Sequence, residues 1–310
     1  MIKTVFFGTP EFASQSFEYL IEQGIIPEAI VTVPDKPQGR NKKIQPSAVK
    51  TLAEKYSIPC FQPEKLKNSE FIHSLREINA DLFVVVAFKI LPQTVLAIPG
   101  KGAINLHASY LPEYRGASPI QTVILNDEEY TGVTTFFLNK EIDGGDILCR
   151  KKIKILDKYN AGMLYDILLQ EGKELLRKTI IDIDHNQIQP IPQPKEFQHY
   201  ASKFSKEDTR IQWNKDVRTV FNQIRAFSPY PGAFTNYQNQ LLKFYASEII
   251  DPENQGNPGK ITISKSRKEL IVETMKGSLK ITEIQASGKK KMKTEEFLKG
   301  FSIQDSAFFS

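Results

Sequence analysis

The sequence predicts an α/β protein of two domains: a Rossmann-like domain with a mainly parallel sheet, followed by a small OB-like β-barrel. Residues 81–88 (Asp-Leu-Phe-Val-Val-Val-Ala-Phe) are almost continuously apolar, which is typical of a strand buried on both faces of a parallel sheet. Strand-like and helix-like segments alternate through residue 183, and mainly short strand-like segments follow. At 310 residues, the chain is long enough for two ample cores.

The elements expected in the first domain follow from the spacing of their apolar residues. Strands are expected at residues 2–7, 29–33, 82–88, 103–106, 131–138 and 147–155. Helices are expected at residues 10–23, 47–56, 69–78, 118–125 and 161–183. We expect Thr9 to cap the first helix and Pro10 to occupy its first position. The prolines of residues 187–195 favour an extended segment, so we place the domains at 1–186 and 205–310, with a linker at 187–204.

The second domain is expected to start with a helix at residues 216–226 and to continue as five short strands. The strands are expected at residues 233–237, 241–248, 259–264, 269–274 and 278–286. Such a series fits an OB-like barrel, a fold used on nucleic acids. Residues 201–310 hold 18 Lys and Arg against 12 Asp and Glu. This excess suggests a polyanionic partner, although a solvated lysine-rich surface, including the run 289–293, explains it equally well.

The composition is that of a soluble protein, and we expect it to be cytoplasmic and monomeric. Hydrophobic residues make up 40% and charged residues 25% of the chain. The N-terminus predicts a strand rather than a signal peptide, and no apolar run is long enough to span a membrane. Cys60 and Cys149 lie far apart, so neither a disulfide framework nor a metal site is expected. Gly8 stands alone where a dinucleotide-binding motif needs three glycines, which argues against a nicotinamide cofactor.

Two polar residues, Asn105 and His107, mark the end of the strand expected at 103–106. The ligand sites of open α/β sheets lie at the carboxyl ends of their strands. Asn offers a neutral amide donor, and His is the side chain that titrates nearest to working pH. On its own, however, an Asn-x-His pair is more often a capping Asn beside a hydrogen-bonded core His. Residues 143–146 (Asp-Gly-Gly-Asp), between two expected strands, are by themselves typical of a turn.

The residues after His107 favour a catalytic interpretation. Residues 109–119 (Ser-Tyr-Leu-Pro-Glu-Tyr-Arg-Gly-Ala-Ser-Pro) resemble the Ser-Leu-Leu-Pro-x-x-Arg-Gly signature of the folate-dependent formyltransferases. With Asn105, His107 and Asp143, the resemblance is specific, covers essentially the whole chain and points to the branch that acts on methionyl-tRNA. The signature departs from the family at two positions that concern ligand packing, Tyr110 for the usual Leu and Ser118 for a common Ala.

The resemblance implies a reaction in which a formyl group passes from 10-formyltetrahydrofolate to the α-amine of methionine on initiator tRNA. Asn105 would donate a hydrogen bond to the formyl oxygen, and one such donor is typically worth ~10²–10³ in rate. His107 would stabilise the same charge or assist proton transfer, and Asp143 would orient the imidazole or help to deprotonate the amine. No metal is implied. The signature residues that would contact the folate are Ser109, Tyr110, Leu111 and Pro112, while Arg115 and Gly116 would hold the shape of the loop.

A loop rich in cations, residues 34–46, follows the second expected strand. Its three prolines and Gly39 argue against regular structure. Four of its side chains carry donors suited to phosphate, namely Lys36, Arg40, Lys42 and Lys43. On composition alone, a solvated flexible loop is an equal explanation. The resemblance favours tRNA binding, because formyltransferases that act on tRNA carry a basic insertion here and relatives acting on glycinamide ribonucleotide lack it.

Two other functions stay open at this point. A formyltransferase acting on a nucleotide-linked sugar amine would share the three catalytic residues, but the basic loop and the positive C-terminal third argue against it. A non-catalytic RNA-binding module built on the same fold would have no need of Asn105, His107 and Asp143 together.

Overall fold

The computed structural model describes residues 2–38, 43–238 and 240–310. The chain forms two compact units. Unit 1 consists of the residues up to Gly116 together with 131–153 and 167–200, and unit 2 consists of 117–130, 154–166 and 201–310. Most of the expected linker therefore groups with unit 1. The boundaries at residues 186 and 205 stay a prediction.

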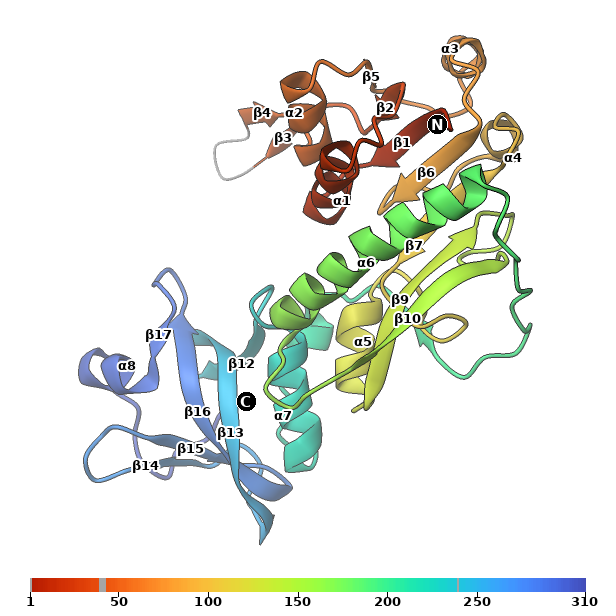
Figure 1. Ribbon diagram of the computed structural model, residues 1–310. Helices are drawn as coiled ribbons and strands as arrows, with labels where there is room; N and C mark the ends of the chain where they lie inside the picture. Colours follow the sequence, from red (N-terminus) through yellow and green to blue (C-terminus); the bar gives the residue numbers. More distant parts are fainter. Residues whose placement is uncertain (1, 39–42, 239) are drawn as a thin grey trace. The chain divides into compact units, whose positions relative to one another are not determined.

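Unit 1 contains a seven-stranded, mainly parallel sheet, which confirms the α/β fold class (Figure 1). Its strand order is β10-β9-β7-β6-β1-β2-β5, in which the neighbours from β7 to β5 are parallel and β9 is antiparallel to β7. The strands are β1 (Thr4–Gly8), β2 (Ala29–Val31), β5 (Cys60–Phe61), β6 (Leu82–Val86), β7 (Ala103–His107), β9 (Tyr130–Phe137) and β10 (Ile147–Lys154). Every residue of β1 and β6 is buried, as the continuous apolar runs predict.

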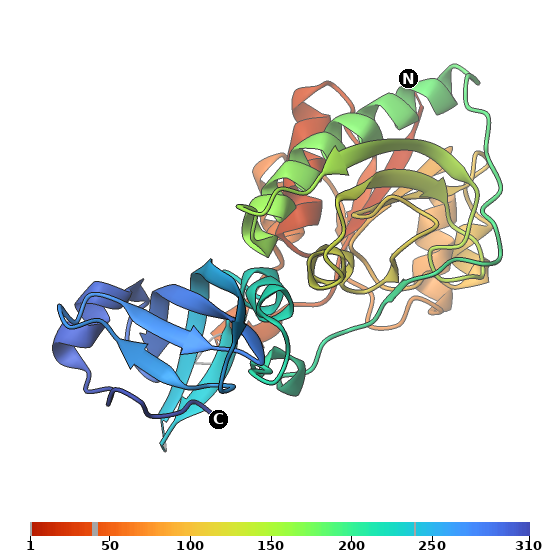
Figure 2. The same cartoon turned by 90° about the horizontal axis from the view of Figure 1, so that it is seen from below.

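Helices cover both faces of this sheet, because successive residues of a strand point to opposite sides (Figures 1 and 2). The helices are α1 (Glu11–Glu22), α2 (Ala48–Lys55), α3 (Ser69–Glu77), α4 (Gln93–Leu96) and α6 (Ala161–Asp184), of which the first residues of α6 belong to unit 2. Phe6 stacks on Phe17 of α1 with ring centroids 5.1 Å apart. Phe7 belongs instead to the core that includes Phe71 of α3 and Val95 of α4.

The expected start of the first helix is wrong by one residue. Pro10, not Thr9, is the N-cap residue, and α1 begins at Glu11. The Pro10 carbonyl accepts hydrogen bonds from the backbone N–H groups of Ala13 and Ser14, at 3.0 and 3.1 Å. Proline suits this position because an N-cap residue does not need to donate its backbone N–H within the helix.

Residues 34–46 contain regular structure, contrary to the expectation. β3 (Lys36–Gln38) and β4 (Lys43–Gln45) pair antiparallel, with Pro37 opposite Ile44. Both strands of a two-stranded ribbon are edge strands, so a proline is tolerated where its missing N–H would point outwards. The connection between these strands, residues 39–42, lies outside the described residues.

Unit 2 contains an antiparallel sheet in the order β12-β13-β16-β15-β14, with β17 beside β16. The strands are β12 (Ala233–Tyr237), β13 (Gln240–Gln255), β14 (Ile261–Ile263), β15 (Leu270–Glu273), β16 (Lys276–Ala286) and β17 (Met292–Lys293). The helices are α5 (Pro119–Leu125), η1 (Glu207–Thr209), α7 (Val217–Ala226) and α8 (Thr294–Gly300). The five expected strands are confirmed, but β17 and α8 were not expected.

The core of unit 2 is aromatic. Trp213 stacks on Phe309 with centroids 5.9 Å apart, and Phe244 meets Phe309 edge-on at 5.4 Å. The Trp213 indole N–H donates to Thr235 Oγ1 at 3.0 Å, so its polar atom is satisfied inside the core. No helix in the described ranges is both long and apolar enough to cross a membrane.

Candidate active site

The predicted pair Asn105 and His107 lies on β7, at the carboxyl end of the parallel sheet. Asn105 is flanked by Val85 of β6 and Phe136 of β9 in the sheet register. Because Asn105 and His107 are two residues apart on one strand, their side chains project from the same face. The structure therefore brings both side chains to one side of the sheet.

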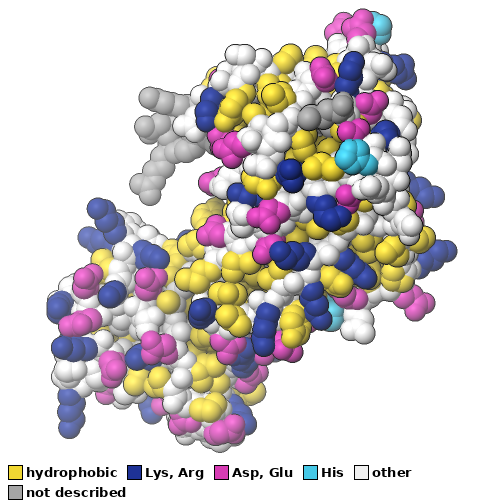
Figure 3. All heavy atoms as spheres, viewed as in Figure 1, with side chains coloured by type: hydrophobic (Ala, Val, Ile, Leu, Met, Phe, Trp, Pro, Cys, Tyr) yellow, Lys and Arg dark blue, Asp and Glu magenta, His cyan; other side chains and the backbone are white. Residues whose placement is uncertain are grey.

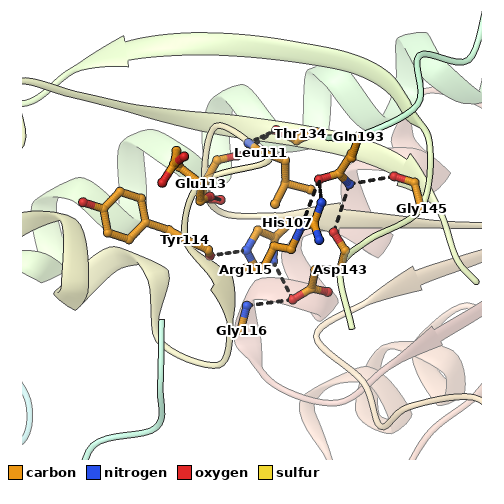
Figure 4. A network of polar contacts seen from close by, with 11 residues as sticks. His107, Leu111, Glu113, Tyr114, Arg115, Gly116, Thr134, Asp143, Gly145 and Gln193 are labelled. Atoms are coloured by element: carbon orange, nitrogen blue, oxygen red, sulfur yellow. Dashed lines mark hydrogen bonds and ion pairs between the residues drawn. The ribbon is translucent and has the colours of Figure 1, made fainter. Parts of the chain in front are cut away.

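His107 is buried and has a polar partner for each ring nitrogen (Figure 4). Its Nε2 lies 2.9 Å from the carbonyl oxygen of Tyr114, and its Nδ1 lies 3.8 Å from Oδ2 of Asp143. A carbonyl oxygen can only accept, so Nε2 carries the hydrogen of the neutral ring. Nδ1 is consequently the ring nitrogen that carries a lone pair, and it faces the Asp143 carboxylate.

Asp143 is held in an unusual backbone conformation, with φ of +50°. Its Oδ2 accepts a hydrogen bond from the backbone N–H of Gly116 at 2.9 Å, which ties it to the signature loop. A Cβ on Gly145 would lie 1.7 Å from the carbonyl oxygen of Phe137, so the turn leaves no room for a side chain there. Strained turns of this kind cluster at functional sites. The Asp-Gly-Gly-Asp motif is thus a turn that aims a carboxylate at His107.

A cavity of about 340 Å³ opens beside these residues and is lined by Asn105 and Asp143. Its other lining residues come from β6 itself and from the segments after β6 and β9: Val85, Phe88, Lys89, Ile90, Leu91, Leu96, Leu138, Asn139, Lys140, Glu141 and Ile142. Ile90 and Ile142 are 75% and 52% exposed, which gives the cavity an apolar rim. The Asn105 amide makes no side-chain hydrogen bond to any described residue. A flat ligand with apolar faces and polar groups at its edge would fit this lining.

The four expected folate contacts, residues 109–112, do not line this cavity. Ser109 and Leu111 are buried, and the Ser109 hydroxyl donates to the carbonyl oxygen of Glu113 at 2.7 Å. The guanidinium carbon of Arg150 lies over the Tyr110 ring, 4.5 Å from the ring centroid. The peptide bond between Leu111 and Pro112 is cis. Their contact with folate stays a prediction.

No pattern in the sequence indicates that the Pro-rich segment after α6 contacts the candidate site. The buried Arg115 donates from Nε and Nη2 to Oε1 of Gln193, at 3.1 and 2.8 Å. His199, for which the sequence suggested no role, stacks on Tyr114 with ring centroids 5.2 Å apart. The backbone N–H of Tyr114 donates to the carbonyl of His199 at 2.9 Å. These contacts join residues about 80 positions apart, so no local pattern could have predicted them.

Of the expected tRNA contacts, Lys36 is exposed on β3 and Lys43 begins β4. Arg40 and Lys42 lie outside the described residues. In unit 2, several Lys form ion pairs, and Figure 3 shows basic and acidic side chains interspersed on the visible face. Three of these pairs are Lys276–Glu253, Lys280–Glu248 and Lys291–Glu283.

No group of three or more His, Cys, Asp or Glu in the described part of the chain could hold a metal ion. The site presents the amide of Asn105 and the carboxylate of Asp143 at the cavity, with the imidazole of His107 beside that carboxylate. This set can stabilise a negatively charged oxygen and move protons.

Comparison with known proteins agrees with this chemistry. The Formyl transferase family model matches residues 2–180, and the Formyl transferase, C-terminal domain model matches residues 203–302. The methionyl-tRNA formyltransferase of Staphylococcus epidermidis is 41% identical over 99% of this chain and 98% of its own. The methionyl-tRNA formyltransferase of Clostridium acetobutylicum is 43% identical over 98% of each chain.

Solved structures share the fold at lower identity. The N-formyltransferase of Helicobacter canadensis, in complex with folinic acid and dTDP-3-aminofucose, has a TM-score of 0.67 and 22% identity over 94% of this chain and all of its own. HypX of Aquifex aeolicus, in complex with tetrahydrofolic acid, has a TM-score of 0.65 and 17% identity over all of this chain and half of its own. With two family models covering most of its length and relatives above 40% identity along nearly all of it, this chain belongs to the formyl transferase family.

Proposed function

We propose that this chain transfers a formyl group from 10-formyltetrahydrofolate to the α-amino group of methionine on initiator tRNA. The proposal rests on one observation: Asn105 and Asp143 line the same cavity, and Asp143 faces His107 at 3.8 Å. The methionyl-tRNA formyltransferases to which the chain is similar along its whole length support the choice of amine.

The reaction is acyl transfer to an amine. The amine nitrogen attacks the formyl carbon, and negative charge grows on the formyl oxygen. The bond from that carbon to the folate nitrogen then breaks, and a proton lost by the amine replaces it on the leaving nitrogen. The enzyme has to stabilise the oxygen and move this proton.

Each of the three residues has a role in this reaction that fits its surroundings. The Asn105 amide, which makes no side-chain hydrogen bond within the described part of the chain, donates to the formyl oxygen. His107 exchanges the proton through Nδ1, because Nε2–H donates to the Tyr114 carbonyl. Asp143 stabilises the ring while Nδ1 is protonated.

The folate donor would enter the cavity of about 340 Å³ with its flat ring system against the apolar wall. The lining residues Phe88, Leu91 and Leu96 would contact this ring, and the exposed Ile90 and Ile142 would cover its outer part. Of the expected folate contacts, Tyr110 and Pro112 keep exposed surface and can reach the rest of the donor. The buried Ser109 and Leu111 would act by holding the loop.

The tRNA would be bound by the basic residues around the β3–β4 hairpin and by the C-terminal domain, residues 205–310. Lys36, Arg40, Lys42 and Lys43 are the proposed contacts in the hairpin, with phosphate as their partner. The 18 Lys and Arg of residues 201–310, against 12 acidic residues, would favour the same polyanion.

The proposal is tested by offering the purified protein 10-formyltetrahydrofolate with one of three amines: methionyl-tRNA, a sugar-nucleotide amine or glycinamide ribonucleotide. The proposed function requires that methionyl-tRNA be formylated with a kcat/KM far above that for the other two. Preferential formylation of the sugar amine would instead support the second candidate function. The likeness to a sugar N-formyltransferase structure, at 22% identity, extends to the fold alone.

A further inference from the structure

Gln193, in the Pro-rich segment after α6, makes four side-chain hydrogen bonds with its single amide (Figure 4). Its Oε1 accepts from Nε and Nη2 of Arg115, at 3.1 and 2.8 Å. Its Nε2 donates to the carbonyl oxygens of Asp143 and Gly145, at 2.9 and 2.6 Å. We propose that Gln193 is a positioning residue, which fixes the turn that aims Asp143 at His107; this inference rests on the proposed function.

The two carbonyls that Gln193 holds bracket the strained part of the turn. Asp143 has φ of +50°, and the crowding at Gly145 fixes the chain against Phe137. The Asp143 carboxylate is held separately, by the backbone N–H of Gly116. Gln193 therefore sets the main chain of Asp143, while the signature loop sets its side chain. Both are needed to hold Oδ2 at 3.8 Å from His107 Nδ1.

Arg115 links Gln193, which holds the main chain of Asp143, to Gly116, which holds its side chain. It is buried, and among the described residues it has no carboxylate partner. Its charge is met by Gln193 Oε1, by the Pro194 carbonyl at 3.2 Å from Nη2 and by the ring of Phe197, 4.5 Å away. Because Arg115 directly precedes Gly116, displacement of Gln193 would disturb both contacts to Asp143.

The position requires a side chain that accepts and donates at the same time, and an amide does both. In Gln193→Glu, the carboxylate keeps its contacts to Arg115 and turns them into an ion pair. It loses both donors, however, and faces two carbonyl oxygens. This variant therefore separates the contact that stabilises Arg115 from the contacts that position Asp143.

The experiment measures the single-turnover rate of formyl transfer to methionyl-tRNA, with both substrates saturating, alongside folate affinity and thermal unfolding. Gln193→Glu should lower the rate about tenfold to hundredfold, as misplacement of a catalytic group by about 1 Å does. Folate affinity and Tm should change little. Gln189 is exposed in the same segment and makes no side-chain hydrogen bond to a described residue, so Gln189→Glu should match wild type.

A double variant identifies the route of the effect. If Gln193 acts through Asp143, adding Gln193→Glu to Asp143→Asn should slow that variant less than about twofold. The inference would be overturned if Gln193→Glu slowed the Asp143→Asn variant as much as it slows wild type. It would also be overturned if folded Gln193→Glu transferred formyl at the wild-type rate. Should Gln193→Glu fail to fold, Gln193→Ala undergoes the same comparison. Wild-type protein that formylates no methionyl-tRNA would contradict the proposed function instead, and the variants would then be compared on the amine that it does formylate.

Discussion

The two ring nitrogens of His107 have different tasks. Nε2 is committed to the Tyr114 carbonyl at 2.9 Å, whereas Nδ1 faces the Asp143 carboxylate at 3.8 Å. In the proposed reaction, this asymmetry leaves Nδ1 as the ring nitrogen that would carry the proton. At the scale of single residues, the site depends on which group faces Nδ1.

Asp143→Asn should reduce the single-turnover rate by orders of magnitude while leaving the fold intact. The amide oxygen can still accept from Gly116, but a neutral amide stabilises a protonated Nδ1 far less than a carboxylate does. Rates with both substrates saturating, beside a thermal melt, check this expectation. Equal rates for the variant and wild type would remove Asp143 from the reaction. A lower Tm with unchanged activity per folded molecule would show that Asp143 has a structural role only.

Gly145→Ala should destabilise the protein by about 1–3 kcal/mol, because the added Cβ would overlap the Phe137 carbonyl oxygen at 1.7 Å. The turn that carries Asp143 would also shift, so activity should fall together with stability. Gly100→Ala is the matched control, since a Cβ there would have no described residue other than its chain neighbours within 4 Å. Urea unfolding of both variants checks the prediction. If both variants lost the same free energy of unfolding, the structure would accommodate a Cβ at Gly145 without destabilisation.

At the scale of elements, the sequence was informative where an element is made by its own residues. The strand β6 and the buried strand β1 follow from continuous apolar runs. The β3–β4 hairpin escaped prediction because its prolines are tolerated on open edges, a property of the pairing rather than of the segment. α8 was not predicted, because the lysine-rich run before it is typical of a solvated surface and does not indicate that a helix follows.

Arg40→Ala should lower kcat/KM for methionyl-tRNA strongly and leave folate affinity unchanged. Arg40 belongs to the connection between β3 and β4, and its planar fork can bridge phosphate and base edges. Loss of one phosphate contact should reduce the salt dependence of tRNA binding by about one unit of slope. Lys67→Ala, an exposed cation elsewhere in unit 1, is the control. If kcat/KM and the slope both stay at wild-type values, the connection is a solvated insertion.

Arg218→Gln tests how α7 is attached to the other segments of unit 2. Arg218 binds the carboxylates of Asp127 and Asp157, and its hydrogen bonds lower the pKa of both. A lowered pKa stabilises the fold above the usual value of 3.8, and this contribution is lost as the pH falls through the lower, folded-state pKa. Because the carboxylates are partly exposed, each pair should contribute about 1 kcal/mol or less.

Urea unfolding of wild type and Arg218→Gln should therefore show a difference in free energy at pH 7 that shrinks steadily below pH ~4. Lys268→Gln, which removes an exposed pair with Glu295, provides the comparison for a single surface ion pair. A difference that stays constant from pH 7 to pH 2 would show that Arg218 stabilises unit 2 through packing instead.

At the scale of the whole molecule, the active site joins segments far apart in the chain, and this limits what the sequence can reveal. Asn105, His107 and Asp143 were found because their motifs resemble a known family. Gln193 was missed, since its partners lie 48 to 78 positions away. The apolar side of the cavity, after β6, was not predicted for a related reason. Those residues line a cavity only together with the turn after β9, which is distant in the sequence.

The central claim is that Asn105, His107 and Asp143 act as one unit on the formyl group. The most direct test is the single-turnover transfer of labelled formyl from 10-formyltetrahydrofolate to initiator methionyl-tRNA, in wild type, the three single alanine variants and the triple variant. Groups that act as a unit have strongly non-additive effects, so the triple variant should be slower than the slowest single variant by no more than about tenfold. The claim would be contradicted if the rate loss of the triple variant equalled the product of the three single losses. It would also be contradicted if wild-type protein did not formylate methionyl-tRNA.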